Sequence, residues 1–312
     1  MLSLTEDDVK RLAPVESVIE ALEAAFTRDF AQTLHMPVRS SLPLAGEGML
    51  LVMPASDSAL GLAGIKTVTV TKARGVAAYY DLLDAESGAA LARMEANWIT
   101  DLRTAGTSAL ATRLLARSDA HTLGIFGTGR QAEAHLAVLP MARKFSRILV
   151  CGANAEKVGR FCKTMTDRHN IEIEPTDVER CIRESHVVCT CTTSRVPLFD
   201  GRWLTPGTHL NLIGAFQPES REVDDETIVR SRVVVDTYAG ALAEAGDLLI
   251  PLSKGVIGRD HILAELHEVA SGQKQVRRGP DDITLFKSVG CALEDLVTAK
   301  VIYERARSEE ES

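Results

Sequence analysis

Residues 122–132 read Thr-Leu-Gly-Ile-Phe-Gly-Thr-Gly-Arg-Gln-Ala, a short apolar run that enters a glycine-rich turn, and an amphipathic stretch continues to residue 143. Strand, turn and helix in this order, with G-x-G-x-x-A spacing, are the fingerprint of dinucleotide binding. Gly127 suits the tight turn, Gly129 lets the backbone approach a pyrophosphate, and Ala132 keeps the helix close to the sheet. Free N–H groups at the helix start favour phosphates. We therefore predict a nucleotide-binding domain that takes a nicotinamide cofactor.

The rest of the chain divides into two patterns. Beyond residue 120, strand and helix patterns alternate, which predicts an α/β fold with a Rossmann-type, doubly wound parallel sheet. Residues 1–117 mix helices and strands and predict a second, smaller α+β domain. We expect helices over 6–30, 99–115 and 288–307. The expected strands are 49–53, 62–70, 78–83, 89–94, 122–126, 147–151, 186–190, 209–213 and 233–236.

Composition narrows the functional class. The 312 residues are 45% hydrophobic and 25% charged, with a net charge of −8 and only 4% aromatic residues. Nucleic acid is a poor partner for such a chain, because it selects a basic surface with stacking side chains. No apolar run is long enough for a membrane span, and the N-terminal residues do not resemble a signal peptide. The six cysteines form no C-x-x-C pair. We expect a cytoplasmic protein with reduced thiols and no metal, in which Cys189 and Cys191 are small core residues.

Cofactor choice depends on the turn after the second strand of the nucleotide domain. NAD-selective sites usually place Asp or Glu there to bind the ribose 2′-hydroxyl. This chain reads Val-Cys-Gly-Ala-Asn-Ala-Glu-Lys over 150–157, without an acid at the strand end. Asn154 and Lys157 leave room for a 2′-phosphate, and Arg130 could reach over. The sequence favours NADPH and leaves NADH possible.

Three basic residues outside this domain are candidates for binding an anion. Arg103 lies near the start of the helix expected over 99–115, where it opposes the helix dipole unless an anion binds there. Lys66 lies in a run suited to a buried strand, where an amine is costly without a partner or a role. A solvated surface arginine and an edge-strand lysine are the ordinary alternatives. Arg39 is a weaker candidate by itself.

Together these residues resemble the ornithine cyclodeaminase/mu-crystallin family, and the resemblance covers nearly the whole chain. It rests on a set of motifs in a fixed order: Arg39, Gly64-Ile-Lys66, Asp81, Gly88, Ile99-Thr-Asp-Leu-Arg-Thr-Ala105, Gly127-Thr-Gly-Arg-Gln-Ala132, Pro206-Gly-Thr-His-Leu-Asn211, Gly214-Ala215, Glu244-Ala-Gly-Asp247, Phe286-Lys-Ser-Val-Gly290 and Glu294-Asp295. The resemblance implies a dinucleotide domain over 118–287 and a substrate and dimerisation domain from 1–117 plus 288–312, in a homodimer.

The resemblance also implies roles for individual residues. Arg39, Lys66 and Arg103 correspond to a clamp for the substrate carboxylate, with Lys66 and Arg103 as catalytic residues. Cyclodeaminases of the family carry an aspartate where this chain has Phe216, and an apolar ring there suits a neutral or cyclic substrate. A shortened loop leaves Tyr79 or Tyr80 to shape the pocket. The expected cofactor-binding residues are Gly127, Thr128, Gly129, Arg130, Gln131, Ala132, Asn154, Lys157, Thr192 and Thr104.

These expectations combine into one hypothesis and two alternatives. The hypothesis is an NAD(P)H-dependent reductase that converts Δ1-pyrroline-2-carboxylate or Δ1-piperideine-2-carboxylate into L-proline or L-pipecolate. The first alternative is an ornithine or lysine cyclodeaminase or an alanine dehydrogenase, which Phe216 disfavours. The second is a non-catalytic, mu-crystallin-like binding protein, against which the retained Lys66 and Arg103 argue.

Overall fold

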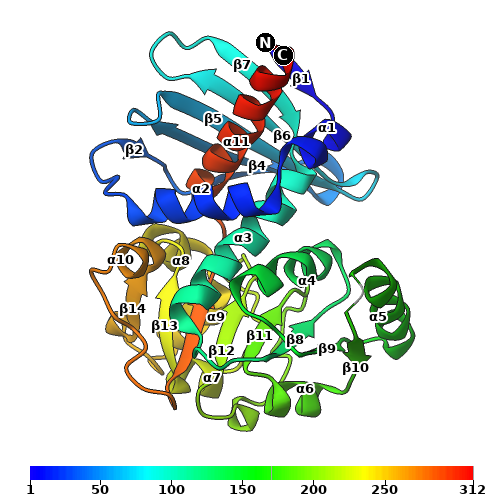
Figure 1. The fold of residues 1–312 in the computed structure, drawn as a ribbon. Helices are drawn as coiled ribbons and strands as arrows, with labels where there is room; N and C mark the ends of the chain where they lie inside the picture. The colour runs from blue at the N-terminus through cyan, green and yellow to red at the C-terminus, as the bar shows by residue number, and fades with distance from the viewer. Residues whose placement is uncertain (170, 312) are drawn as a thin grey trace. The chain divides into compact units, whose positions relative to one another are not determined.

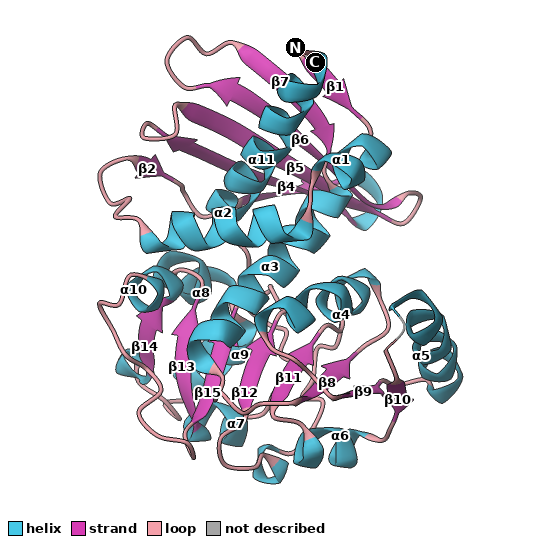
Figure 2. Cartoon of the chain, viewed as in Figure 1, coloured by secondary structure: helices cyan, strands magenta, loops and turns pink. Residues whose placement is uncertain are grey.

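A computed structural model describes residues 1–169 and 171–311 of the chain. The chain forms two compact units, and each is described by itself. One unit contains Met1–Thr107 and Gly290–Ser312, and the other contains Ser108–Val289. Figures 1 and 2 follow the chain through both units and label their helices and strands. In the described part of the chain, no helix combines the length and the apolar character that crossing a membrane requires.

The first unit begins with two helices, α1 (Glu6–Leu12) and α2 (Val15–Thr27), where the sequence predicts one helix over 6–30. Thr5 caps α1 through a capping box with Asp8. Pro14 ends the continuity, because proline lacks an N–H donor and disfavours the helical conformation of the residue before it. Pro14 then serves as the N-cap of α2. The prediction of a single helix was therefore wrong at this proline.

A mixed sheet forms the body of this unit, in the order β1-β7-β6-β5-β4-β2, with β3 paired to β4. All its pairs are antiparallel except β1 with β7, which are parallel. The four strands expected between residues 49 and 94 are present as β4 to β7. The strands are β1 (Leu2–Leu4), β2 (Leu34–His35), β3 (Ser40–Leu44), β4 (Gly48–Asp57), β5 (Leu62–Thr71), β6 (Gly75–Asp84) and β7 (Ala90–Glu95).

Two further helices, α11 (Ala292–Glu310) and α3 (Asn97–Leu115), are long. Helix α11 lies against α2 and against β4, β5 and β6, as Figure 1 shows. It begins at residue 292 instead of the expected 288, because Gly290 has φ +84° and Cys291 is extended. Helix α3 contains the division between the two units, after Thr107.

The second unit contains an eight-stranded sheet in which every pair is parallel, in the order β10-β9-β8-β11-β12-β15-β13-β14. The chain moves outward from β8 in one direction and then from β11 in the other, so the sheet is doubly wound, as predicted. Its strands are β8 (Thr122–Phe126), β9 (Arg147–Cys151), β10 (Ile173–Pro175), β11 (Val187–Thr190), β12 (His209–Leu212), β13 (Ser231–Val235), β14 (Ile262–Glu265) and β15 (Ile283–Lys287).

Helices connect most of these strands and cover the sheet, and buried apolar residues of the sheet form the core of this unit. Strands β10, β14 and β15 were not predicted from the sequence. The helices are α4 (Arg130–Ala142), α5 (Ala155–His169), α6 (Val178–Glu184), α7 (Asp225–Arg230), α8 (Tyr238–Glu244), α9 (Gly246–Ser253) and α10 (Leu266–Ala270).

Candidate active site

A cluster of charged side chains lies inside the first unit, where β5 and α3 meet the start of α11. The Lys66 ammonium, on β5, lies 2.7 Å from an Asp295 carboxylate oxygen. The Arg103 guanidinium, on α3, pairs with Glu294 and lies 3.1 Å from the same Asp295 oxygen. Lys66 is 1% exposed, and both acids are fully buried. Burial without pairing would be prohibitive for any of these charges, so the cluster is held together as a set.

The third predicted clamp residue reaches this cluster from the segment before β3. Arg39 is half-buried and donates a hydrogen bond from Nη2 to the Gly290 carbonyl at 3.2 Å. Gly290 adopts φ +84°, which glycine tolerates, and a Cβ there would collide with the Arg103 guanidinium. The structure thus brings Arg39, Lys66 and Arg103 to one turn, which leads into α11.

The electrostatics of the cluster favour an additional anion. Arg39, Lys66 and Arg103 supply three positive charges, while Glu294 and Asp295 supply two negative ones. Burial, together with the charges of Arg103 and Arg39, lowers the pKa of Lys66 to about 8 although Asp295 opposes the shift. Burial also acts to lower the pKa of Arg103, but Asp295 and Glu294 outweigh it and the pKa lies above its usual value. Among these five side chains the basic groups outnumber the carboxylates, a composition that suits binding of an anion.

Two buried oxygen atoms at this cluster have no hydrogen-bond partner among the described residues: the Tyr80 hydroxyl and Asp295 Oδ2. Tyr80 pairs with Lys66 across β5 and β6, and it is completely buried. Burial, and then the Asp295 carboxylate, raise the pKa of the Tyr80 phenol, which stays protonated and can donate. Buried polar atoms normally have partners, so these two are free to meet a polar ligand.

The sequence left Tyr79 or Tyr80 open as the pocket residue, and the structure brings only Tyr80 to the cluster. Tyr79 is 40% exposed, and the Arg93 guanidinium lies 5.3 Å from the centre of its ring. Neighbouring strand residues point to opposite faces of a sheet, which separates Tyr79 from Lys66. Thr104 is buried on α3, where its hydroxyl donates to the Thr100 carbonyl at 2.7 Å.

The second unit contains the glycine turn between β8 and α4. Gly127 adopts φ +112°, and a Cβ there would lie 2.5 Å from the Cys191 carbonyl oxygen. Gly129 is the N-cap of α4 and is exposed, with open space where a Cβ would lie, whereas Ala132 is fully buried. This arrangement leaves the start of the helix open to a phosphate and fits a dinucleotide. Thr128, Arg130 and Gln131 belong to the same turn, and Arg130 is exposed.

Beside this turn, a hollow of about 620 Å³ lies at the carboxyl ends of β9 and β10. Ligands of open α/β sheets bind at such ends. Gly152, Asp177 and Arg180 are among its lining residues. Asn154 is exposed and caps α5 by accepting a hydrogen bond from the Lys157 backbone at 2.9 Å. The residue that follows β9 is Gly152, so the turn has no carboxylate in the position usual for NAD selectivity.

Glu222 is an organising residue that the sequence analysis missed. Its carboxylate accepts hydrogen bonds from the hydroxyls of Thr190 and Thr192, both at 2.7 Å, and from the Gly214 backbone at 2.7 Å. Burial, and then the Asp247 charge, raise its pKa, while Lys287 and the two threonines oppose the rise. Glu222 thus fixes Thr192, a predicted cofactor residue, to the loop after β12.

The same loop carries Phe216, which is 39% exposed in this unit. The buried Lys287 ammonium donates to the carbonyls of Leu212 at 3.3 Å and Ala215 at 2.5 Å, and it pairs with Asp247 at 3.0 Å. Asp247 in turn accepts from the Glu222 backbone at 2.7 Å. The loop is therefore held by buried charges from three separate parts of the chain.

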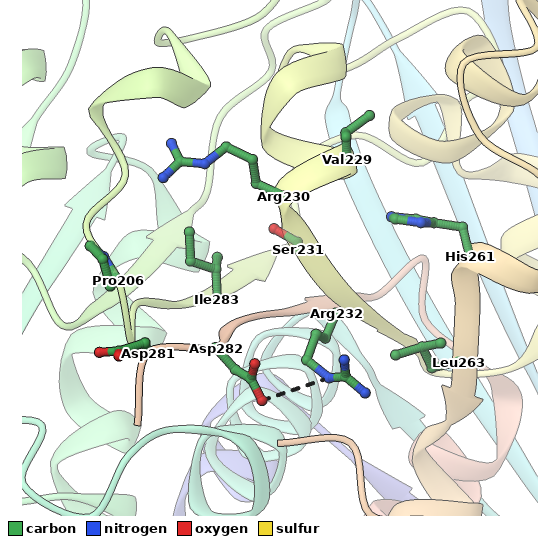
Figure 3. A pocket seen from close by; sticks show the side chains of 10 residues that line it. All are labelled: Pro206, Val229, Arg230, Ser231, Arg232, His261, Leu263, Asp281, Asp282 and Ile283. Carbon is green, nitrogen blue, oxygen red and sulfur yellow. Dashed lines mark ion pairs between the residues drawn. The ribbon is translucent and has the colours of Figure 1, made fainter. Parts of the chain in front are cut away.

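Another hollow, of about 470 Å³, lies at the amino ends of β13 and β15 (Figure 3). Its basic side chains already have protein partners. Arg230 donates to the Gly201 and Leu204 carbonyls, Arg232 donates to the Val276 carbonyl at 2.6 Å, and His261 bonds the Ile228 carbonyl at 2.7 Å. Because it lies at the edge away from the carboxyl ends, we do not assign the nucleotide to it.

Known proteins resemble this chain along nearly its whole length. The model of the ornithine cyclodeaminase/mu-crystallin family matches residues 1–310. A Δ1-pyrroline-2-carboxylate reductase of Bacillus cereus is 32% identical, covering 98% of this chain and 97% of the relative. The Thermococcus litoralis Δ1-pyrroline-2-carboxylate reductase, solved with NADH and L-proline, is 36% identical with a TM-score of 0.95, covering 99% and 98%. An archaeal alanine dehydrogenase dimer with bound NAD is 32% identical with a TM-score of 0.93, covering 99% and 97%.

The fold and the two sites thus define a dinucleotide-dependent oxidoreductase with a Rossmann-type unit. The chain belongs to the ornithine cyclodeaminase/mu-crystallin family, as its motifs predicted.

Proposed function

We propose that this protein reduces a cyclic α-imino acid, Δ1-pyrroline-2-carboxylate or Δ1-piperideine-2-carboxylate, to L-proline or L-pipecolate with NAD(P)H. The observation that carries this proposal is the cluster of Arg39, Lys66 and Arg103, in which the buried Lys66 ammonium has one hydrogen-bond acceptor among the described residues, Asp295 Oδ1. A substrate carboxylate would supply the acceptors that this ammonium lacks. The similarity to Δ1-pyrroline-2-carboxylate reductases supports the same class of substrate.

We assign the substrate to the unit that contains Met1–Thr107 and the dinucleotide to the unit that contains Ser108–Val289. The two guanidinium groups would orient the carboxylate, because a planar fork binds it bidentately. Bound NAD(P)H supplies the hydride for the imine carbon. Lys66 would give a proton to the imine nitrogen, since a pKa of about 8 keeps its ammonium mostly charged at neutral pH and still able to release a proton. The imine thereby gains one hydride and one proton and becomes an amine.

For the cofactor, we propose that NADPH is favoured and that NADH is also used. Gly152, Ala153 and Asn154 after β9 carry no negative charge that would repel a 2′-phosphate, and Lys157 is exposed nearby. The relatives solved with NADH or NAD support use of the unphosphorylated form as well. We also propose a homodimer, since the archaeal alanine dehydrogenase is a dimer.

Oxidation of an amino acid is the competing reaction. The similarity to alanine dehydrogenase favours testing it. Phe216 argues against the cyclodeaminase reaction, because an aromatic ring cannot neutralise the second ammonium of ornithine or lysine.

The test is oxidation of NADPH and NADH by the purified protein with each cyclic imine, beside parallel assays of L-ornithine and L-alanine with NAD for ammonia release. Rapid oxidation with an imine, abolished in Lys66→Met while NADPH still binds, is the expected result. Ammonia from ornithine with an inert imine would refute the reductase proposal and our interpretation of Phe216. Tight NADPH binding without turnover on any of these compounds would refute it in favour of a binding protein.

A further inference from the structure

Three side chains in the second unit combine in a way that neither the dinucleotide site nor the imine site uses. His135 on α4 lies beside Cys189 on β11 and Cys191 just after it. Their ligand atoms, one nitrogen and two sulfurs, all lie within 4.8 Å of one another. The Cys189 and Cys191 sulfurs are 3.7 Å apart, and the Cys191 sulfur is 3.7 Å from His135 Nδ1.

These distances match the edges of a tetrahedral metal site. Metal–sulfur bonds of about 2.3 Å and metal–nitrogen bonds of about 2.0–2.1 Å place neighbouring ligand atoms roughly 3.8 Å apart for two sulfurs and roughly 3.6 Å apart for sulfur and nitrogen. The Cys189–Cys191 and Cys191–His135 separations differ from these edges by about 0.1 Å, and the third pair, Cys189 and His135, lies within 4.8 Å, so side-chain rotation would bring all three to one ion. We propose that His135, Cys189 and Cys191 bind a thiophilic cation of the Zn²⁺ class.

The surroundings of the three ligands suit such a cation. His135 Nδ1 now bonds the Gln131 carbonyl at 2.7 Å, and Nε2 bonds the Ser108 hydroxyl at 2.9 Å. If the proton moves from Nδ1 to Nε2, the bond to the Gln131 carbonyl breaks, the Ser108 oxygen accepts from Nε2, and Nδ1 becomes a ligand; such outer hydrogen bonds fix metal-binding histidines. The sequence did not predict this site, because His135 lies 56 residues from Cys191.

Charge and access agree with this assignment. Burial acts to raise the pKa of the Cys191 thiol, but the Cys189 hydrogen bond and His135 bring it below its usual value. Burial, its bond to Cys191 and the charges of Cys191 and Glu222 raise the pKa of Cys189. Binding would therefore release the Cys189 proton and form two sulfur–metal bonds, with the two thiolates balancing a divalent charge. Cys191 is only half-buried, which gives the ion a path, and three protein ligands leave one position for water, as in exchangeable sites.

The test uses the full-length protein with a phosphine reductant that keeps its thiols free. Cd²⁺ is added stepwise, the sulfur-to-metal charge-transfer absorption is followed, and Zn²⁺ affinity is measured by competition with a chromophoric chelator. We expect one equivalent per chain and proton release on binding. Cys191→Ser and Cys189→Ala should each weaken binding at least tenfold, and Ser108→Ala by about 10–100-fold, as for other second-shell changes.

Cys162→Ser is the matched control, because Cys162 is also a buried thiol but lies on α5, outside this group. It should leave the affinity unchanged, and circular dichroism checks that every variant is folded. Absence of the charge-transfer absorption in the wild type would overturn the proposal. So would unchanged affinity in both Cys191→Ser and Cys189→Ala. The test does not depend on turnover, so its failure says nothing about the imine reductase activity.

Discussion

Replacing Lys66 by methionine should remove activity and at the same time make the protein more stable. Lys66 is completely buried, and its pKa falls from 10.5 to about 8. A shift of this size corresponds to about 3 kcal/mol against the charged ammonium at pH 7. Asp295 is not left alone in the variant, because Arg103 Nε remains 3.1 Å from it. We expect the free energy of unfolding to rise by about 1–3 kcal/mol, since an apolar side chain of similar length fills the space.

The pH dependence gives a second, independent test of this reasoning. The folded state holds the Lys66 pKa near 8 and the unfolded state near 10.5, so between these values the unfolded chain binds more protons. The stability of the wild type therefore rises relative to Lys66→Met as the pH increases from 8 to 10.5. The difference in free energy of unfolding between Lys66→Met and the wild type should become smaller from pH 8 to 10.5 and remain constant below pH 8.

Urea unfolding at equal protein concentrations and several pH values measures both effects. Lys287→Met is the matched control, because it also replaces a fully buried lysine, but one that pairs with the fully buried Asp247 at 3.0 Å. Its loss leaves a buried carboxylate without its cation and should cost about 3–5 kcal/mol. If Lys66→Met is instead destabilised by a similar amount, or if its gap to the wild type does not change with pH, Lys66 is a structural residue and our reasoning fails.

The other predictions concern the proton donor, the cofactor and the buried acid. With the imine substrate, kcat/KM should fall above about pH 8 as Lys66 loses its proton. A Lys66→Arg variant keeps the positive charge but cannot release a proton, so it should lose turnover at every pH; activity in this variant with an unchanged limb would argue for another donor. Gly152→Asp should raise the ratio of kcat/KM for NADH to kcat/KM for NADPH at least tenfold, because a carboxylate there binds the ribose 2′-hydroxyl and repels a 2′-phosphate. Steady-state kinetics with both cofactors measures this ratio, and an unchanged ratio would show that the turn is not the 2′ site. Glu222→Gln places an amide NH₂ against the backbone N–H groups that now donate to the carboxylate. It should lower the free energy of unfolding by about 1–3 kcal/mol and weaken NADPH binding measured by fluorescence titration. Glu219→Gln, at an exposed residue of the same loop, should change neither quantity.

Local patterns predicted the parts of the fold that depend on local interactions. The strand 122–126 is present at the predicted residues, because the short length of the apolar run and the glycine turn that follows it favour a buried strand over a helix. Pro14 is itself a local indication that the helix breaks there. The apolar residues on both sides keep helical spacing, so the sequence pattern predicted one continuous helix. Strand β15 was not predicted. It ends in Lys287, whose buried partner, Asp247, lies far away in the sequence, so no neighbouring residue indicates that this lysine can be buried.

In the candidate site, too, local motifs predicted single residues but not the contacts between distant parts of the chain. The motifs identified Arg39, Lys66 and Arg103, but not that Glu294 and Asp295 would neutralise two of their charges. Those acids lie near the other end of the chain, and only the path of α11 against β5 brings Asp295 to Lys66. Residues such as Glu222, which act by holding other residues, have no type or spacing that distinguishes them in the sequence.

The two buried lysines show how geometry separates a structural charge from a functional one. An ammonium has three N–H donors. The Lys287 ammonium donates to two acceptors, the carbonyls of Leu212 and Ala215, and also forms an ion pair with Asp247 at 3.0 Å. Among the described residues, the Lys66 ammonium has one acceptor, Asp295 Oδ1. A buried donor without an acceptor costs free energy, and a bound carboxylate would recover that cost. The unfilled donors of Lys66 are therefore the strongest structural reason to expect substrate at this residue, and the reason that its removal should stabilise the chain while removal of Lys287 should not.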